Sequence, residues 1–567
     1  MGRSDWQLVK QEAQSSKGMV VAKQPDAAEM GRTVLGEGGN AVDAAVATAF
    51  ALGVVEPMMS GIGGGGYLLY HHAESGRTHV VNFSMIASEA AHEKMYELDE
   101  AGGVAPGLFS WPKVKDDANI HGAKSVAVPG VVAGLGLALE KFGSGSITWA
   151  EALKPAVKLA GEGFHLDWQN MLYFVEEWDL LRRYRETAAL FLPNGRPPMT
   201  ATSGHAAEIF KQPALARTLD TLATKGPKAF YEGEIARNLA ENVTAHGGAL
   251  TENDLADYKP VVEEPLVVPY DDCVVYAPGG PSGGTSLAMS LNILREMGGS
   301  SGDLSDPEVW HKRIEAVRLS FADRLVYLAD PAFADVPYDR LLSNAYAAER
   351  ASLVGHDALP YPAPAGEPNL APIAQGPRSE ESTTHLVVID RALNLVAITQ
   401  TLLSLFGSGL VEPKTGILLN NGMMWFDPEP KKANSVAARK RPLCNMSPVV
   451  ATCCGRPFLA LGASGGRRIQ SAVYQVFLNI VEGKVWSPQA AMDMPRFDCS
   501  MPDKTLIETR VGENVLKNLV ARGHKLEETV ESVVLRNYAS PVGALVTEEG
   551  VIKGGSERWH GGIALGL

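Results

Sequence analysis

The chain has few cysteines and no metal-binding cysteine motif. Only five of its 567 residues are cysteine, too few for a disulfide framework, and the adjacent pair Cys453 and Cys454 does not have metal-site spacing. All five are therefore expected to be small buried hydrophobic residues, and no metal is expected.

An excess of basic charge and a long apolar run are also missing. Acidic residues outnumber basic ones, 65 to 51, which leaves no basic stripe for a phosphate backbone and excludes nucleic acid as an expected partner. The longest apolar stretch, 44–55, is shorter than the ~20 residues that cross a bilayer, so it is expected to be a buried helix without membrane contact. The first residues lack the layout of a secretion signal, and the protein is expected to be cytoplasmic.

What is present is the composition of a packed globular protein, 45% hydrophobic and 20% charged. A helix is predicted to begin after Asn40, with Asn40 as N-cap and Asp43 in the first turn, and to end near Glu56. Further helices are predicted over 131–141, 310–328 and 468–481. Strand-like runs are predicted over 267–276, 416–419, 449–453 and 457–461. This mixture indicates an α/β or α+β fold with layered sheets.

A Pro, Ala and Gly-rich stretch at 359–382 predicts a mobile linker. Two strand patterns follow, 383–390 and 394–401, joined by a loop short enough for a hairpin. If Asp390 faces Asn394, the same register places Thr383 opposite Thr401.

Two hydroxyl groups at the free end of a strand match the requirements of an N-terminal threonine nucleophile. Peptide cleavage before Thr383 would free an α-amine that acts as general base, while the second hydroxyl orients the nucleophile. The alternative is that Thr383 and Thr401 are two ordinary strand threonines.

Separated motifs along nearly the whole chain resemble the γ-glutamyltransferase family. In the second half they are Glu381-Ser-Thr-Thr-His385, Thr399-Gln-Thr401, Phe406-Gly-Ser-Gly409, Gly416-Ile-Leu-Leu-Asn-Asn421, Lys440-Arg-Pro-Leu443, Met446-Ser-Pro448 and Gly465-Gly466. In the first half they are Gly38-Gly-Asn-Ala-Val-Asp43, Gly61 to Gly66, Val128-Pro-Gly130, Pro281-Ser-Gly-Gly284 and Ala322-Asp-Arg324. Many blocks in the same order are more specific than any one motif.

The resemblance implies an α+β fold, a four-layer αββα sandwich of the N-terminal nucleophile hydrolase type. It would be built jointly by residues 1–382 and 383–567, which separate by autocatalytic cleavage between Ser382 and Thr383. Thr383 would be the nucleophile, Thr401 its supporting hydroxyl, and Gly465 and Gly466 the oxyanion donors. The implied partners are a small-molecule amide substrate and the two subunits of a heterodimer, with a dimer of heterodimers left open; no cofactor is implied.

The positions that recognise a γ-glutamyl donor in the family are mostly changed here. Ser84 replaces an Arg and Leu403 an Asn; Gly422 and Trp425 replace a Gln and an Asp, and Cys444-Asn445 replaces a Ser-Ser pair. Hydrogen bonds to charged groups contribute about 1.5–3 kcal/mol each, so the changes predict weak γ-glutamyl recognition. Leu403, Met423, Met424, Trp425 and Phe426 suggest an apolar acyl pocket or plain core. Arg467 is either a binder of a substrate carboxylate or a member of a surface ion pair.

Three other functions remain open at this stage. A true glutathione hydrolase would bind its donor in another way, and an uncut family member would be a binding protein. Gly462-Ala-Ser464-Gly-Gly466 also fits a nucleophile elbow, with Ser464 served by Asp498 or Asp503 and by His524 or His560. Dinucleotide binding at 61–66 is disfavoured because a helix, not a strand, precedes these glycines.

Overall fold

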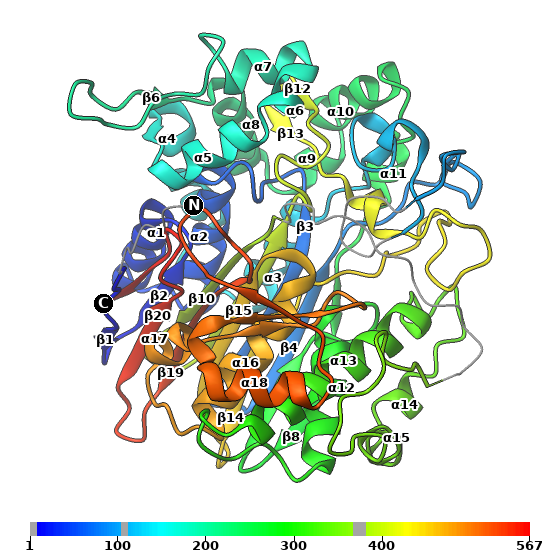
Figure 1. Cartoon of the computed structure of the whole chain (residues 1–567). Coiled ribbons are helices and arrows are strands. Elements are labelled where there is room, and N and C mark those ends of the chain that lie inside the picture. The colour runs from blue at the N-terminus through cyan, green and yellow to red at the C-terminus, as the bar shows by residue number, and fades with distance from the viewer. Residues whose placement is uncertain (1–7, 104–110, 367–381) are drawn as a thin grey trace.

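The computed structural model describes residues 8–103, 111–366 and 382–567. Within them, two seven-stranded sheets lie face to face (Figure 1). The β15 sheet has the order β1 (Ala13–Ser15), β20 (Ile552–Ser556), β19 (Ser540–Val546), β15 (Arg456–Ser464), β14 (Val449–Cys453), β9 (Cys273–Ala277), β8 (Leu266–Tyr270). The β10 sheet has the order β21 (Ile563–Gly566), β2 (Met19–Ala22), β10 (Thr384–Ile389), β11 (Leu395–Thr401), β3 (Gly65–His72), β4 (Arg77–Phe83), β7 (Val261–Glu263).

Helices cover the outer face of each sheet. α1 (Pro25–Gly36), α2 (Ala41–Val55) and α3 (Val131–Phe142) pack on the β10 sheet, while α12 (Gly283–Glu296), α16 (Ile469–Val481) and α17 (Pro488–Asp493) pack on the β15 sheet. Because β10 and β11 pack directly against β15, the layers are helix, sheet, sheet and helix. The predicted α+β, four-layer αββα sandwich is confirmed.

The remaining elements surround this sandwich. A group of helices lies above it in Figure 1: α4 (Trp149–Glu162), α5 (Trp168–Glu176), α6 (Trp178–Arg183), α7 (Arg185–Phe191), α8 (Pro213–Lys225), α9 (Lys228–Tyr231), α10 (Glu234–Ala245) and α11 (Glu252–Ala256). The other helices are α13 (Pro307–Tyr327), α14 (Tyr338–Leu341), α15 (Asn344–Ala351) and α18 (Glu513–Ala521). The short strands are β5 (Phe164–His165), β6 (Ile209–Phe210), β12 (Val411–Glu412), β13 (Ile417–Leu418), β16 (Phe497–Asp498), β17 (Thr505–Glu508) and β18 (Leu526–Thr529). No helix of the described ranges has the length and apolar character needed to cross a membrane.

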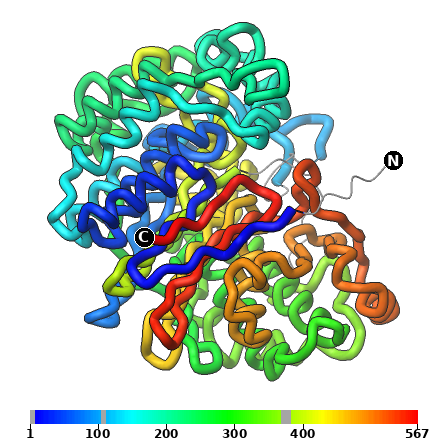
Figure 2. Tube along the Cα trace, turned by 90° about the vertical axis from the view of Figure 1, so that its left-hand side faces the viewer, coloured from blue at the N-terminus to red at the C-terminus, as the bar shows by residue number. Residues whose placement is uncertain are grey.

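Both halves of the chain contribute strands to both sheets. β10 is hydrogen-bonded to β2 and β14 to β9, so in both sheets strands from before residue 382 pair directly with strands from after it. Figure 2 shows the blue first strands beside the red last strands, where β1 pairs with β20 and β2 with β21. Neither half could bury its sheet faces without the other.

Local signals in the sequence correspond closely to these elements. Asn40 caps α2 through a reciprocal capping box with Asp43. The β10–β11 hairpin has the predicted register: Thr384 faces Gln400, and the Asp390 N–H donates to the Asn394 carbonyl at 3.2 Å. The stretch 44–55 is a buried helix, apart from half-buried Gly53.

The prediction that all five cysteines are buried holds for Cys273, Cys444 and Cys499 but is wrong for half-buried Cys453 and exposed Cys454. Cys273 and Cys453 form a disulfide between β9 and β14, and Cys454 is exposed; only Cys444 and Cys499 are buried free thiols. Cys273 and Cys453 are 180 residues apart in the sequence. The pairing of two remote strands brings them together, and no local sequence pattern predicts that pairing. Most of the predicted linker at 359–382 falls on 367–381, outside the described residues.

Candidate active site

The hydroxyl groups of Thr383 and Thr401 meet at one end of the β10–β11 hairpin. Thr383 directly precedes β10 and Thr401 ends β11, and their Oγ1 atoms are 3.3 Å apart. Both side chains are buried. The hairpin register therefore produces the juxtaposition that the sequence predicts.

The peptide bond before Thr383 is held by the same two hydroxyls. Thr401 Oγ1 donates to the Ser382 carbonyl oxygen at 3.1 Å, and Thr383 Oγ1 also hydrogen-bonds to this oxygen. The Leu403 N–H donates to Thr401 Oγ1 at 2.8 Å, and the Ser382 N–H donates to the Leu403 carbonyl at 3.2 Å. A hydrogen bond to a carbonyl oxygen strengthens as negative charge develops there, so this arrangement favours attack at the Ser382 carbonyl carbon.

Gly465 and Gly466 turn the chain from β15 into α16. Their φ angles are +131° and +55°, and a Cβ on Gly465 would lie 2.7 Å from the Ala539 Cα. Positive φ and close packing both select glycine here. Among the described residues, neither glycine N–H donates a hydrogen bond, which leaves both able to point at a developing oxyanion.

Buried residues link the start of β10 to the end of β15. Thr384 Oγ1 donates to Glu56 Oε2 at 2.7 Å on one side, and Lys23 Nζ donates to Ser540 Oγ on the other. Ser540 is the strand partner of Ser464, which directly precedes Gly465. Burial raises the pKa of Glu56 and lowers the pKa of Lys23, while their mutual attraction opposes both shifts. The hydroxyl pair and the glycine turn thus lie at the same end of the sandwich.

Sequence reasoning missed Lys23 and Glu56. Lys23 directly follows the apolar strand β2, and Glu56 directly follows the apolar helix α2. A charged residue at the end of an apolar element is the only local signal in the sequence that could have marked them as site residues. His385, two residues after Thr383, is also buried; its ring packs on Gly462, and Nδ1 hydrogen-bonds to Thr399 Oγ1 at 2.8 Å. Burial and then Lys23 lower the pKa of His385 to about 3, so the imidazole is neutral.

Of the predicted specificity positions, Leu403 contacts the hydroxyl pair through its backbone. Gly422 and Trp425 belong to a buried 3₁₀ turn, Gly422–Trp425, and a Cβ on Gly422 would lie 2.9 Å from Met85 Sδ, next to Ser84. Leu403, Met423, Met424, Trp425 and Phe426 are all buried in one hydrophobic cluster. The apolar character expected of this region is present.

The other predicted specificity positions have polar surroundings. Ser84 Oγ donates to Asn82 Oδ1 at 2.8 Å. Arg324 of α13 binds the Cys444 carbonyl and, at 2.9 Å, Asn445 Oδ1, whereas Asn445 Nδ2 has no partner in the described part of the chain. Arg467, next to the glycine turn, is only 6% exposed, so it is not a surface residue.

The nucleophile elbow at Ser464 has the predicted strand, turn and helix but lacks a base. Ser464 Oγ contacts the Ser540 carbonyl at 3.5 Å. In the described ranges, His560 hydrogen-bonds to Glu557 at 2.6 Å and His524 to His311 at 2.8 Å, and neither hydrogen-bonds to Ser464. Asp498 accepts from Ser500 at 2.6 Å, and no hydrogen bond joins Asp503 to either histidine. The geometry therefore disfavours Ser464 as nucleophile.

Among the residues that the structure describes, one group of side chains has the composition of a metal site: His311, Glu315 and His524, whose ligand atoms lie within 4.8 Å of one another. His311 Nε2 must carry hydrogen because it meets the Gly355 carbonyl at 2.9 Å, so its Nδ1 accepts from His524 Nε2. Arg318 lies 2.6 Å from Glu315. The two neutral rings satisfy each other and a cation already sits on the carboxylate, so these residues form a structural hydrogen-bond network.

The sequence matches a known protein family over nearly its whole length. The family model described as Gamma-glutamyltranspeptidase matches residues 27–567. This chain belongs to the gamma-glutamyltranspeptidase family.

Relatives within this family differ in their stated activity. The chain is 35% identical over 562 residues to the glutathione hydrolase proenzyme of Bacillus subtilis (strain 168), covering 97% of this chain and 91% of the relative. It is 36% identical over 526 residues to an acylase ACY 1 proenzyme of Pseudomonas sp. (strain V22), covering 92% and 89%. The crystal structure of cephalosporin acylase from Bacillus halodurans superposes with a TM-score of 0.87 at 28% identity, covering 100% of this chain and 98% of that one.

Proposed function

We propose that this gamma-glutamyltranspeptidase-family enzyme matures by cutting its own chain between Ser382 and Thr383. The observation that carries the proposal is the Ser382 carbonyl oxygen, bonded by both threonine hydroxyls at the strand end. Thr383 Oγ1 attacks the carbonyl carbon, the peptide nitrogen leaves as the Thr383 amine, and water then hydrolyses the ester. The products are a Ser382 carboxylate and a free N-terminal threonine.

The mature site would then hydrolyse an amide in a substrate. The new α-amine takes the proton of Thr383 Oγ1, which attacks the substrate carbonyl, while the Gly465 and Gly466 N–H groups stabilise the oxyanion. The amine leaving group departs, and water releases the acid from the acyl-Thr383 ester. Transfer of the acyl group to another amine is the competing outcome of the same intermediate.

The substrate is proposed to be an acyl amide other than a γ-glutamyl compound. Ser84 supplies no cation where the family resemblance places a carboxylate-binding Arg, and Leu403 lies in an apolar cluster. Losing two or three charged hydrogen bonds of about 1.5–3 kcal/mol corresponds to roughly a thousandfold or more in affinity. The similarity to acylases fits this substrate class, whereas the similarity to the Bacillus subtilis hydrolase favours glutathione as the second candidate.

Two measurements test the proposal. Purified protein run on a reducing denaturing gel is expected to give bands of about 41 and 20 kDa from the 60.5 kDa chain, which remain associated in native buffer because each half exposes core without the other. Thr383→Ala should stay intact.

Mature enzyme should cleave a simple acyl anilide with a higher kcat/KM than γ-glutamyl anilide. Efficient hydrolysis of glutathione would instead establish the second candidate, a glutathione hydrolase.

A further inference from the structure

The only disulfide in the described part of the chain joins the two sides of the proposed cleavage site. Cys273 lies on β9, before residue 382, and Cys453 lies on β14, after residue 383. They are direct cross-strand partners in the antiparallel β9–β14 pair. Their sulfur atoms are therefore brought together by the sheet that both halves share.

The disulfide lies where two hairpins of the β15 sheet end together. β8 and β9 turn through Asp271 and Asp272, while β14 and β15 turn through Cys454 and Gly455, and the Cys454 N–H donates to the Asp272 carbonyl at 2.9 Å. This hydrogen bond connects the two turns beside the disulfide. The pairing thus has a second, backbone contact that holds the same two halves in register.

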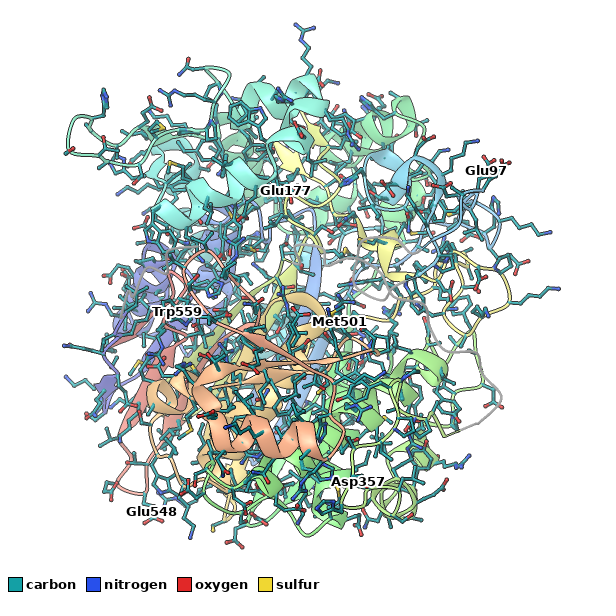
Figure 3. All side chains as sticks on the ribbon, viewed as in Figure 1. Glu97, Glu177, Asp357, Met501, Glu548 and Trp559 are labelled. Atoms are coloured by element: carbon teal, nitrogen blue, oxygen red, sulfur yellow. A yellow bond between two sulfur atoms is a disulfide. The ribbon has the colours of Figure 1, made fainter. Side chains whose placement is uncertain are left out.

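Solvent can reach this disulfide. Cys273 and Cys453 line a cavity of about 870 Å³ whose wall includes both acidic and basic residues, such as Glu548 and Lys553. Figure 3 shows Glu548 at the lower edge of the molecule, opposite the helices at the top. Cys453 is half-buried and the neighbouring Cys454 is exposed. Because neither sign of charge dominates the wall, a small neutral or anionic thiol can enter.

We propose that the Cys273–Cys453 disulfide is a covalent tether between the two subunits, and that a small thiol can open it. The proposal rests on the cleavage proposed above, since an uncut chain has no separate subunits to join. In oxidation, the two cysteine thiols lose two protons and two electrons to a low-molecular-weight disulfide, which becomes two thiols. In reduction, one small thiolate attacks a tether sulfur and displaces the other cysteine as a thiolate. A second small thiolate then attacks the small-molecule sulfur of the mixed disulfide, which releases a low-molecular-weight disulfide and the second cysteine thiolate; protonation restores both cysteine thiols.

The tether would act alongside the noncovalent contacts of the shared sheets. Once the chain is cut, unfolding of an unlinked heterodimer releases two molecules, so its stability depends on protein concentration; a linked heterodimer unfolds as one molecule. The Tm of oxidised mature protein should therefore not change over a hundredfold dilution. After reduction and alkylation it should fall with dilution. A Tm that falls equally in both forms would contradict the tether.

The direct test compares denaturing gels of mature protein with and without reductant, after exposure to oxidised glutathione and alkylation. A tethered enzyme gives one band near 60.5 kDa without reductant and two bands with it. Two bands in both lanes would overturn the tether and leave the cleavage proposal standing. One full-length band in both lanes would mean that cleavage has failed and that there are no subunits to tether.

Counting thiols decides the pairing itself, whether or not the chain is cut. Alkylation under denaturing conditions without reductant should label Cys444, Cys454 and Cys499 only; labelling of all five cysteines would overturn the assignment. Cys273→Ser and Cys453→Ser should each give two bands without reductant, whereas the adjacent control Cys454→Ser should keep the single band. If Cys454→Ser loses it, the tether uses Cys454 and the assignment to Cys453 is wrong.

Discussion

Thr401 Oγ1 lies 3.3 Å from Thr383 Oγ1 and donates a 3.1 Å hydrogen bond to the carbonyl that precedes Thr383. One hydroxyl thus contacts both the candidate nucleophile and the bond that the nucleophile would cut. The N–H of Leu403 donates to the oxygen of the same hydroxyl, which orients the Thr401 hydroxyl while its hydrogen points at the Ser382 carbonyl. This relationship makes Thr401 the residue whose removal should affect maturation most specifically.

Thr401→Val should slow self-cleavage by about 10²–10³-fold, the typical cost of removing one oxyanion donor. Valine keeps the shape but removes the hydrogen bond to the Ser382 carbonyl. A time course of fragment appearance on a reducing gel measures the rate. Thr399→Val is the matched control on the same strand: its hydroxyl binds His385, so it should mature at close to the normal rate. Equal rates for both variants would remove Thr401 from the mechanism.

Ser464→Ala should mature and keep most of its activity, whereas Thr383→Ala should do neither. The reason is that Ser464 contacts only the Ser540 carbonyl and has no histidine base among the described residues. An acylating active-site probe followed by peptide mass spectrometry should label Thr383 in the mature enzyme. A label on Ser464 with an unmodified Thr383 would establish the elbow mechanism.

The kcat/KM of mature enzyme should rise about tenfold per pH unit and level off near pH 7.7–8.0, where an α-amine loses its proton. Buried histidines do not account for such a limb, because desolvation lowers the pKa of His385 to about 3 and that of His560 to about 4. A pH profile of single-turnover acylation measures it. An acid limb centred near pH 6.5 would indicate a histidine base.

Glu531 should make the protein less stable as pH rises from about 4.5 to about 8. Burial raises the pKa of Glu531 to about 8, so in this range the folded state holds a proton that the unfolded state has released. Each pH unit then removes up to about 1.4 kcal/mol of stability. Glu531→Gln has no carboxyl group to titrate, so the Tm of this variant minus the Tm of wild type should increase between pH 5 and pH 8. Glu528→Gln, with an exposed side chain, is the control and should show a constant difference.

Arg467→Ala should distinguish two classes of acyl substrate. Arg467 is buried and directly follows Gly465 and Gly466, the proposed oxyanion donors, and a guanidinium binds a carboxylate in a bidentate manner. Cleavage of an acyl group that ends in a carboxylate should lose a few kcal/mol of transition-state stabilisation, while a neutral acyl amide should be cleaved almost normally. Paired kcat/KM values measure this, and equal losses for both substrates would assign Arg467 a structural role.

Sequence alone predicts those features that depend on neighbouring residues. The Asn40 cap, the buried helix after it and the β10–β11 hairpin are local, because the interacting groups are at most a few turns or one hairpin apart. Since hairpin pairing fixes which residues face each other, it also predicts the meeting of Thr383 and Thr401. The motif order then supplied the family and the glycine turn.

Only the tertiary structure decided how remote elements combine at the candidate site and between the two halves of the chain. Lys23 reaches Ser540 across 517 residues of chain, and Glu56 reaches Thr384 from the end of α2. Cys273 meets Cys453 because β9 and β14 are neighbours in a sheet. Contacts of this kind depend on strand order and on the stacking of two sheets. Hydrophobic periodicity along the chain does not encode either of them, because many strand orders bury the same apolar faces equally well.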